Sequence, residues 1–298
     1  MGIIEKLWCV MWNIGFVEKS IEQLATDGEE VVEVKWLKHG YNDRFFADPF
    51  MLSGDERVIR VLVEEYFYHT KRGVISLLEV DAKNYELRRR KVVLECSWHQ
   101  SFPFIQRIGD KVYVVPEAAN SGKAIAYEWD DREEVLVNPF TIVDDCLLDG
   151  TYYHSHDGWY LTATKAGEGK HSLMYLYRAK EFCGPYVPLF GGEPIVKDAD
   201  AARSAGYIVE VDGELYRMVQ VCSKVYGEYV KVFRIKKMDA DGFEQEYVKD
   251  LRPAPATFGA TFHTVNGLGS VTVVDGTSRR FRPYFKIKSA LRYALNHK

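Results

Sequence analysis

The sequence predicts an all-β protein, a five-bladed β-propeller with a short C-terminal helix. Three observations predict it: a recurring pair of apolar strands, a glycine-containing turn between them, and near-regular spacing of these turns. The turn glycines are 49 to 55 residues apart along the 298-residue chain. Because glycine adopts the positive φ that tight hairpin turns need, apolar runs on either side of it are a strong hairpin signal. The five turn glycines are Gly54, Gly109, Gly158, Gly213 and Gly267.

Four of the five repeats continue with a further strand after the hairpin. Four antiparallel strands that recur about every 50 residues are typical of a propeller blade, and closing the ring leaves few free sheet edges. A β-sandwich with coincidental spacing is the alternative, which five turns with matching flanks disfavour. Third strands are expected at 73–81, 124–130, 172–177 and 229–235, and shorter fourth strands at 91–94 and 134–137.

The fifth repeat stops after its second strand, so its sheet needs strands from elsewhere. The apolar N-terminal runs 7–16 and 31–37 are expected to supply them and close the ring, and 289–295 to form the terminal helix. No linker-like stretch divides the chain, so we expect a single domain at 1–298. Its blades are expected at about 44–97, 98–142, 143–198, 199–250 and 256–285, closed by strands within 6–37.

Composition narrows the function classes. The formal net charge of −4 argues against a general nucleic-acid binder, because such proteins need a clustered basic face. The five cysteines are scattered without a CxxC pair, which fits a reduced compartment and neither a disulfide framework nor a zinc site. No apolar run approaches the roughly 20 residues that span a bilayer, and the first residues do not resemble a signal peptide. We therefore expect a cytoplasmic protein without a membrane span.

The repeat also predicts where a site would form. In a propeller the first strand of each blade lines the central channel, so the beginnings of these strands meet at one end. Carboxylates accept hydrogen bonds from sugar hydroxyls, arginine and glutamine donate them, and aromatic faces cover the C–H surfaces. We therefore expect a carbohydrate-sized site at that end. The inner-strand positions hold Asp48, Phe102, Asp149, residues 203–206 and His263, and the second strands end near Glu64, Glu65, Glu117 and Gln220.

Three acids are predicted to be catalytic, because glycoside hydrolysis needs one carboxyl as general acid and another as base or nucleophile. Asp48 is the predicted base, since Pro49 fixes the backbone beside it and removes a competing amide. Glu117 ends an apolar strand, where burial would raise its pKa and suit it to donate a proton. Asp149 is expected either to tune the pKa of neighbouring residues or to bind the ligand. The structural alternatives are turn formation by Asp48 and Asp149, and an exposed turn position for Glu117.

Five further residues are predicted to bind the substrate rather than to react. The residues expected to orient a sugar or an attached anionic group are Glu65, Arg203, Arg217, Gln220 and His263.

The sequence indicates neither a metal site nor a cofactor site. His154 and His156 alternate on one strand, but a third ligand is lacking, so we expect no metal. The sequence contains no glycine-rich phosphate loop, serine nucleophile elbow or HExxH motif, so we expect no cofactor.

An ordered set of short motifs covers nearly the whole chain. The motifs lie at 12–15, 46–50, 102–104 with 116–117, 157–161, 184–186, 202–206, 217 with 220, 226–227 and 263–264. The set resembles the propeller domain at the N-terminus of plant glucosamine inositolphosphorylceramide transferases and its stand-alone bacterial relatives. That domain shares the five-bladed fold of glycoside hydrolase family 43 and related furanosidases.

The chain departs from the glycosidase pattern that this resemblance implies. Family 43 enzymes place acids on three inner strands, and this sequence matches only at Asp48 and loosely at Asp149. The fourth-blade position of the proton donor reads Arg-Ser-Ala-Gly at 203–206. Either Glu117 or Glu65 takes over proton donation, or the site binds glycans without cleaving them.

The resemblance implies a glycan-active protein of bacterial polysaccharide or glycolipid metabolism. We expect it to be glycoside hydrolase-like, using Asp48 and Glu117 with help from Asp149. Its expected partner is a carbohydrate: an oligosaccharide, a sugar nucleotide or a glycolipid head group. The alternative is a non-catalytic carbohydrate-binding accessory domain that works with a glycosyltransferase. A protein scaffold is disfavoured, because a scaffold needs no acids converging on a channel.

Overall fold

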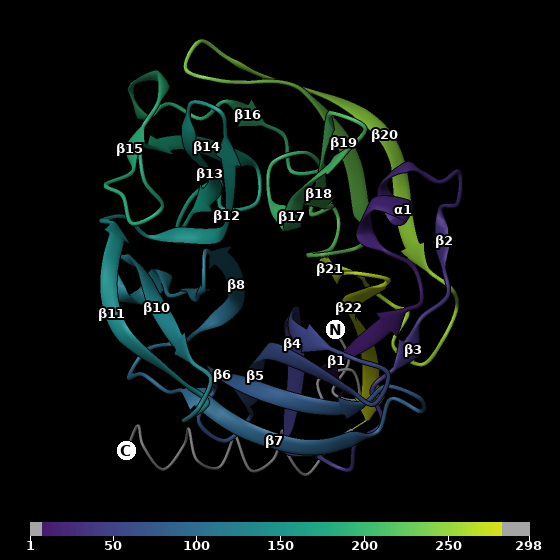
Figure 1. Ribbon diagram of the computed structural model, residues 1–298. Coiled ribbons are helices and arrows are strands. Elements are labelled where there is room, and N and C mark those ends of the chain that lie inside the picture. Colours follow the sequence, from purple (N-terminus) through teal and green to yellow (C-terminus); the bar gives the residue numbers. More distant parts are fainter. Residues whose placement is uncertain (1–7, 282–298) are drawn as a thin grey trace, which may run out of the picture.

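The predicted five-bladed β-propeller is confirmed. The computed structural model describes residues 8–281, which form five sheets around a central axis (Figure 1). The predicted terminal helix at 289–295 lies outside the described residues. So do residues 6–7 of the expected closing segment and residues 282–285 of the expected fifth blade.

The first three blades each come from one continuous stretch of chain, and so do the four main strands of blade four. Their strands follow one another outward from the axis, because each hairpin turn reverses the chain beside its predecessor. Blade one contains β4 (Arg44–Gly54), β5 (Val58–Phe67), β6 (Arg72–Asp81) and β7 (Leu87–Leu94). Blade two contains β8 (Ser101–Ile108), β9 (Lys111–Glu117), η2 (Ala119–Ser121), β10 (Ala124–Asp130) and β11 (Val135–Val143). Blade three contains β12 (Leu147–Ser155), β13 (Gly158–Lys165), β14 (Leu173–Ala179), β15 (Val187–Pro188), η3 (Phe190–Gly192) and β16 (Val196–Lys197). Blade four contains β17 (Ser204–Val211), β18 (Glu214–Gln220), β19 (Val230–Met238) and β20 (Phe243–Pro253).

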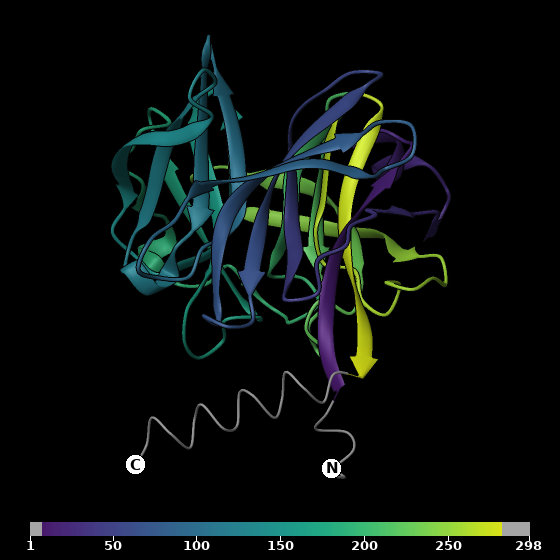
Figure 2. The same ribbon diagram turned by 90° about the horizontal axis from the view of Figure 1, so that it is seen from below.

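The fifth blade joins the two ends of the described chain. Its inner strands β21 (Val265–Leu268) and β22 (Val271–Phe281) are followed by β1 (Trp8–Val17) and β3 (Lys35–Trp36). Figure 2 shows β1 and β22 side by side, antiparallel through the depth of the ring. This pairing closes the ring, because backbone hydrogen bonds join strands from the two ends of the described chain within one blade.

One detail of the closure differs from the expectation. The run at 31–37 serves two blades, because β2 (Val31–Val32) pairs in parallel with β20 of blade four while β3 joins blade five. A short helix, α1 (Ile21–Thr26), precedes it and starts with a capping box between Ser20 and Gln23. The buried Lys249 amine holds this segment against β20 by donating to Asp27 Oδ1 at 2.6 Å. Among residues 8–281, no helix is both long and apolar enough to cross a membrane.

The innermost strands bend at the same point in successive blades. Pairing with the second strand is interrupted there, and Asp48, Phe102 and Asp149 adopt positive φ angles of 51°, 41° and 48°. Such angles cost non-glycine residues on the order of 1 kcal/mol each, so the surroundings must hold them in place. A bulge re-aims the side chain that it carries, and here it turns these residues toward the axis.

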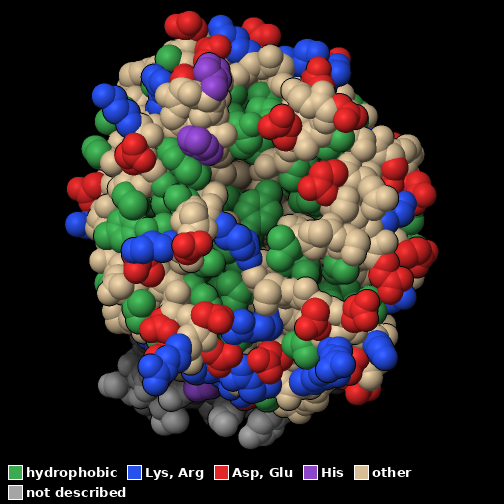
Figure 3. Space-filling view, in the orientation of Figure 1, with side chains coloured by type: hydrophobic (Ala, Val, Ile, Leu, Met, Phe, Trp, Pro, Cys, Tyr) green, Lys and Arg blue, Asp and Glu red, His purple; other side chains and the backbone are tan. Residues whose placement is uncertain are grey.

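Aromatic side chains fill the middle of the ring. Phe50 contacts Phe102 and Tyr207 edge to face, with ring centroids 4.9 Å and 5.4 Å apart. A cavity lies at each end of this packed centre. Figure 3 shows the hairpin-turn end, where apolar side chains surround a central hollow. The opposite end, where the inner strands begin, carries the acids.

Candidate functional site

A cavity of about 230 Å³ opens where the inner strands begin. It contains five of the eight residues predicted from the sequence: Asp48, Glu117, Asp149, Arg203 and His263. The structure therefore brings together all three predicted catalytic acids. The remaining lining residues are Trp12, Ala47, Glu64, His99, Ser101 and Tyr226.

Asp48 is held rigidly at the cavity wall. Its Oδ2 accepts from the amide of Phe102 at 3.1 Å, and its Oδ1 accepts from the Thr264 hydroxyl at 3.0 Å. Burial raises the pKa of Asp48 to about 6; the nearby His263 opposes this shift and the Asp275 carboxylate adds to it. A carboxyl with this pKa is mostly ionised at neutral pH and remains basic enough to take up a proton.

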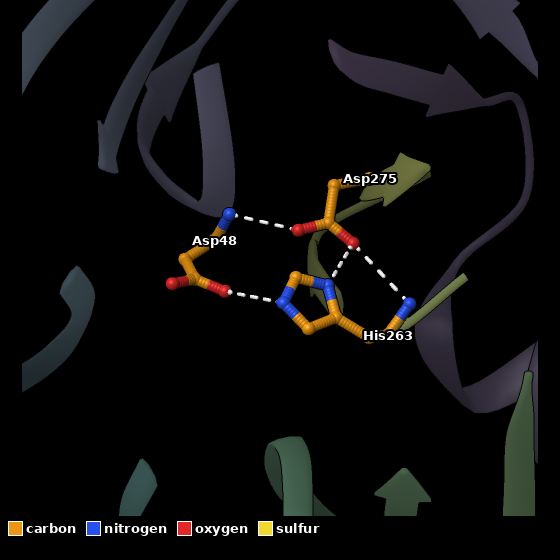
Figure 4. A group of neighbouring side chains, drawn as sticks. All are labelled: Asp48, His263 and Asp275. Atoms are coloured by element: carbon orange, nitrogen blue, oxygen red, sulfur yellow. Dashed lines mark hydrogen bonds and ion pairs between the residues drawn. The ribbon is translucent and has the colours of Figure 1, made fainter. Parts of the chain in front are cut away.

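Asp275, a residue of β22 that lies behind Asp48, organises this part of the site (Figure 4). It is fully buried and accepts from the amide of Asp48 at 2.8 Å and from His263 Nδ1 at 2.6 Å. The opposite ring nitrogen of His263 lies 3.3 Å from Asp48 Oδ1. Burial alone lowers the pKa of a histidine, but Asp275 and then Asp48 raise that of His263, so the imidazolium is favoured.

The same three side chains could be considered as a metal site. Asp48, His263 and Asp275 each offer one ligand atom, and these atoms lie within 4.8 Å of one another. However, the two ring nitrogens of His263 point at different carboxylates, and both already make a short contact (Figure 4). An imidazolium between two carboxylates accounts for this geometry, because a cation would need a ring nitrogen without its proton.

Asp149 and Arg203 form the opposite wall. The Arg203 Nε donates to Asp149 Oδ2 at 2.5 Å, and the Gln220 amide donates to the same oxygen at 2.6 Å. Although burial raises the pKa of a carboxyl, the Arg203 guanidinium holds that of Asp149 below its usual range. Asp149 is therefore a permanent carboxylate whose charge is matched by Arg203.

Two glutamates of the cavity are expected to be neutral. Burial raises the pKa of Glu117 well above its ordinary value, and the neighbouring Asp149 charge adds to the effect. Burial likewise raises the pKa of Glu64 well above its ordinary value, helped by Asp48. The cavity therefore combines proton-carrying carboxyls with ionised ones, the division that acid–base catalysis by two carboxyls requires.

Aromatic rings complete the walls. Trp12 lies against His263 with ring centroids 4.1 Å apart, and Tyr226 meets the same imidazole edge-on at 5.3 Å. The Arg203 guanidinium lies over the Tyr226 ring at 5.1 Å. Gly227 has a φ of +60°, and a Cβ there would lie 2.4 Å from the Cβ of His263. Only glycine allows the Tyr226 loop to pack this closely.

Three predicted binding residues do not line the cavity. Gln220 is fully buried and acts on the site through Asp149. Glu65 points to the other side of β5, where Arg44, Arg90 and Ser76 satisfy its carboxylate at 2.5 to 2.8 Å. We therefore remove Glu65 from the binding set, because adjacent side chains of a strand face opposite sides.

Arg217 is also removed from the binding set. Its guanidinium is buried and donates to the backbone carbonyls of Ala201 and Ala202 at 2.9 and 2.7 Å. Burial lowers its pKa to about 9. Arg217 thus supports the segment that carries Arg203 and makes no contact with the cavity.

The sequence interpretation did not assign a role to several lining residues. Strand position puts Glu64 at a strand end, where the sequence favours its neighbour Glu65, and it gives no role to Trp12, His99, Ser101, Tyr226 or the supporting Asp275. A usable signal exists for two of them, because Glu64 and Asp275 each end the apolar run of a second strand, as Glu117 and Gln220 also do. Glu64 and Glu117 lie directly opposite the inner-strand residues Ala47 and Ser101.

Comparisons with known proteins agree with this architecture. Residues 31–254 match the family model described as glucosamine inositolphosphorylceramide transferase 1, N-terminal. The curated glucosamine inositolphosphorylceramide transferases 1 of Oryza sativa subsp. japonica and Arabidopsis thaliana are 26% and 25% identical over 219 and 223 residues. These matches cover 69% of this chain but only 28% and 27% of those proteins, so the chain spans little more than a quarter of their length.

Solved structures share the fold at low sequence identity. A glycoside hydrolase family 43 β-xylosidase/α-arabinofuranosidase from a compost metagenome has a TM-score of 0.55 at 11% identity, covering 80% of this chain and 92% of that one. The catalytic domain of the Coprinopsis cinerea family 62 α-L-arabinofuranosidase gives 0.54 at 11%, covering 74% and 75%. A family 43 enzyme from Xanthomonas citri gives 0.53 at 14%, covering 80% and 89%.

Proposed function

The chain belongs to the family of the N-terminal domain of glucosamine inositolphosphorylceramide transferase 1, and on that premise we propose that it is a glycan-active protein. Its cavity is proposed to bind a saccharide and to cleave or transfer a glycosyl group in polysaccharide or glycolipid metabolism. The structural neighbours include a β-xylosidase/α-arabinofuranosidase and an α-L-arabinofuranosidase, which supports this class of chemistry.

One observation carries the proposal. Buried carboxyls with raised pKa values face, across a single small cavity, carboxylates held by an arginine and a histidine. A glycosidase needs this division, because one carboxyl must bring a proton and another must take one away. The cavity's aromatic rings and polar groups also suit the alternating C–H and hydroxyl surface of a sugar.

The proposed reaction uses Asp48 as the base. A water molecule attacks the anomeric carbon while Asp48 takes a proton from it, and the bond from that carbon to the leaving oxygen breaks. A neutral glutamic acid, Glu117 in the sequence-based proposal, gives its proton to the leaving oxygen. Asp149, kept ionised by Arg203, stabilises the positive charge that develops on the sugar ring. Proton exchange with solvent then returns Asp48 to its carboxylate form and Glu117 to its carboxylic acid form.

A non-catalytic accessory domain is the second candidate function, and Arg203 favours it. This residue occupies the fourth-blade position where family 43 enzymes carry their proton donor, and its guanidinium engages Asp149 and approaches Glu117 to 3.8 Å. A cavity organised in this way could hold a saccharide for a glycosyltransferase without cleaving it.

The test is a panel of aryl furanosides, aryl pyranosides and anionic oligosaccharides, assayed for turnover and for binding. The catalytic proposal expects turnover that Asp48→Asn lowers by at least about 10³-fold, because the base is lost. Asp110→Asn, a change at an exposed turn acid, serves as the matched control. Saccharide binding without turnover, equal in the wild type and Asp48→Asn, supports the accessory function instead.

A reducing, cytoplasmic location remains part of the proposal. Cys96, Cys146, Cys183 and Cys222 are free thiols in the described chain, which suits such a compartment. Fractionation of cells that produce the native protein, followed by thiol alkylation before lysis, tests this. Recovery outside the cytoplasm with oxidised cysteines would refute it.

A further inference from the structure

Two cavity acids, Asp48 and Glu64, have no arginine or lysine ion pair within residues 8–281, and Asp48 has the charged His263 beside it. Glu64 is 7% exposed and lines the cavity from the second half of β5. Asp149 by contrast binds Arg203, and Glu117 lies 3.8 Å from the same guanidinium. The neighbour of Glu64 within ion-pair range is His99, whose Nε2 is 3.5 Å from Oε1.

His99 faces Glu64 as a neutral donor. The amide of Gly73 donates to His99 Nδ1 at 2.9 Å, so Nδ1 is an acceptor and the ring proton resides on Nε2. Burial lowers the pKa of His99, which favours the same neutral form. The neutral imidazole therefore lies 3.5 Å from one oxygen of the Glu64 carboxyl and supplies no charge that would favour loss of the Glu64 proton.

Gly73 is required for this arrangement. A Cβ at position 73 would lie 2.7 Å from Glu64 Oε1, 2.8 Å from His99 Cε1 and 2.5 Å from the Gln100 carbonyl oxygen. Real side chains do not reach such distances, so only glycine lets β6 pass beside the pair. The backbone of blade one is thus shaped around the contact between Glu64 and His99.

Glu117 is less suited to release a proton into the cavity. Burial and then the neighbouring Asp149 raise the pKa of Glu117, and Glu117 in turn lowers that of Asp149, the pattern expected when Glu117 donates a hydrogen bond to the Asp149 carboxylate. Its proton is therefore shared with a protein carboxylate, and Arg203 stands beside the pair. Transfer to a substrate would have to break this bond.

We propose that Glu64, rather than Glu117, is the general acid of the glycan-processing reaction, with His99 as its positioning residue. This assignment rests on the proposed function and refines it. Glu64 gives its carboxyl proton to the leaving glycosidic oxygen as the bond to the anomeric carbon breaks, and it becomes a carboxylate. Asp48 takes the proton of the attacking water and becomes a carboxylic acid. Exchange with solvent resets both groups, so no other reactant is needed.

The ionisation of Glu64 is set by the whole cavity. Loss of its proton is opposed first by burial and then by surrounding acids from four blades, while His99 is a neutral neighbour. The titratable groups that face Glu64 are His99, Asp48, Asp275, Glu117, Asp149 and Tyr66. Glu64 also lies close to the proposed base along the backbone. Glu64 of β5 is the pairing partner of Ala47 in β4, and Ala47 is the residue before Asp48.

Leaving-group dependence tests the assignment. The probes are phenyl and dinitrophenyl glycosides of the sugar for which the panel above shows turnover. A general-acid variant fails on the phenyl glycoside, whose leaving group needs a proton, but not on the dinitrophenyl glycoside, which leaves unaided. We expect Glu64→Gln to lower kcat/KM for the phenyl substrate by roughly 10²- to 10⁴-fold, and for the dinitrophenyl substrate by less than about tenfold. The alkaline limb of the pH profile should also disappear.

Glu117→Gln is the matched control. We expect it to lower kcat/KM by the same factor on both substrates, and by less than Glu64→Gln lowers it on the phenyl glycoside. The two-substrate comparison is internally controlled, because a partly unfolded sample loses activity on both alike. If Glu117→Gln shows the leaving-group pattern, or if Glu64→Gln affects both substrates equally, the assignment to Glu64 is overturned while the proposed function stands. If the wild type turns over no glycoside of the panel, both fail.

Discussion

The imidazole Nδ1 of His263 lies 2.6 Å from a carboxylate oxygen of Asp275, and this bond joins the fifth blade to the cavity. The other oxygen of Asp275 accepts from the backbone amide of Asp48 in blade one. One buried carboxylate therefore positions both the proposed base and the histidine that contacts it. The bond matters because Asp48 and His263 lie more than 200 residues apart in the sequence.

Asp275→Asn is expected to lower the pKa of His263. Burial alone depresses the pKa of a histidine, and the Asp275 charge is the largest opposing influence. Its removal should therefore shift the His263 titration downward. NMR titration of the imidazole signals, assigned by their loss in His263→Gln, measures this shift. An unchanged titration in Asp275→Asn would show that the short contact carries no charge.

Two groups of the site should make the folded state less stable as the pH rises. Burial raises the pKa of Asp48 to about 6, above the ordinary value of an aspartate, so folding favours its neutral form. Although burial alone disfavours it, folding also favours the His263 imidazolium, because Asp275 and Asp48 raise its pKa. Both contributions are complete below the unfolded-state pKa values and are lost as the pH rises through the folded-state values.

Asp48→Asn is therefore expected to make stability less dependent on pH. It removes one titrating carboxyl and one of the charges that raise the pKa of His263. Urea unfolding of both proteins between about pH 5 and pH 8 should show the wild type losing on the order of 2 kcal/mol more than the variant. Parallel curves for the two proteins would contradict the raised pKa of Asp48.

The fold could be predicted because its blades are encoded locally. Apolar strands separated by glycine turns specify each hairpin, and near-regular spacing specifies the ring. The exception is instructive: β2 is two residues long and pairs with Arg252 and Pro253, more than 200 positions away. No local pattern distinguishes that pairing from addition to the fifth blade.

The site could be predicted only to the level of strand position. Asp48 and Asp149 begin inner strands, so the repeat alone placed them in the channel. The choice between Glu64 and Glu65 depends on strand parity, since adjacent side chains face opposite sides. The same rule separates Arg217 from Gln220, three positions further along β18. Asp275 also follows the apolar run of a second strand, but it does not line the cavity and acts through Asp48 and His263, a role that strand position does not indicate.

Glu65 should matter for stability and not for the chemistry. Its fully buried carboxylate accepts from Arg44 and Arg90, so Glu65→Ala removes the acceptor that the two guanidinium groups share, although Arg44 keeps its ion pair with Asp43. Breaking a buried pair in this way costs about 3–5 kcal/mol of unfolding free energy. We expect that loss in urea titrations, with saccharide binding by the folded fraction unchanged. A selective loss of binding would return Glu65 to the site.

Gly227→Ala tests whether the Tyr226 loop must pack directly on His263. Residue 227 has a φ of +60°, and an added Cβ would lie 2.4 Å from the Cβ of His263. Gly213→Ala is the matched control, because its φ of +78° imposes a similar backbone strain while nothing lies within 4 Å of an added Cβ. The difference between the two variants therefore isolates the contact from the strain.

We expect Gly227→Ala to lose roughly 1–3 kcal/mol more unfolding free energy than Gly213→Ala, because the loop must move off the imidazole. That movement also takes the Tyr226 ring away from Arg203, so saccharide affinity should fall in Gly227→Ala alone. Equal losses in both variants would mean that the loop already stands clear of His263 in solution.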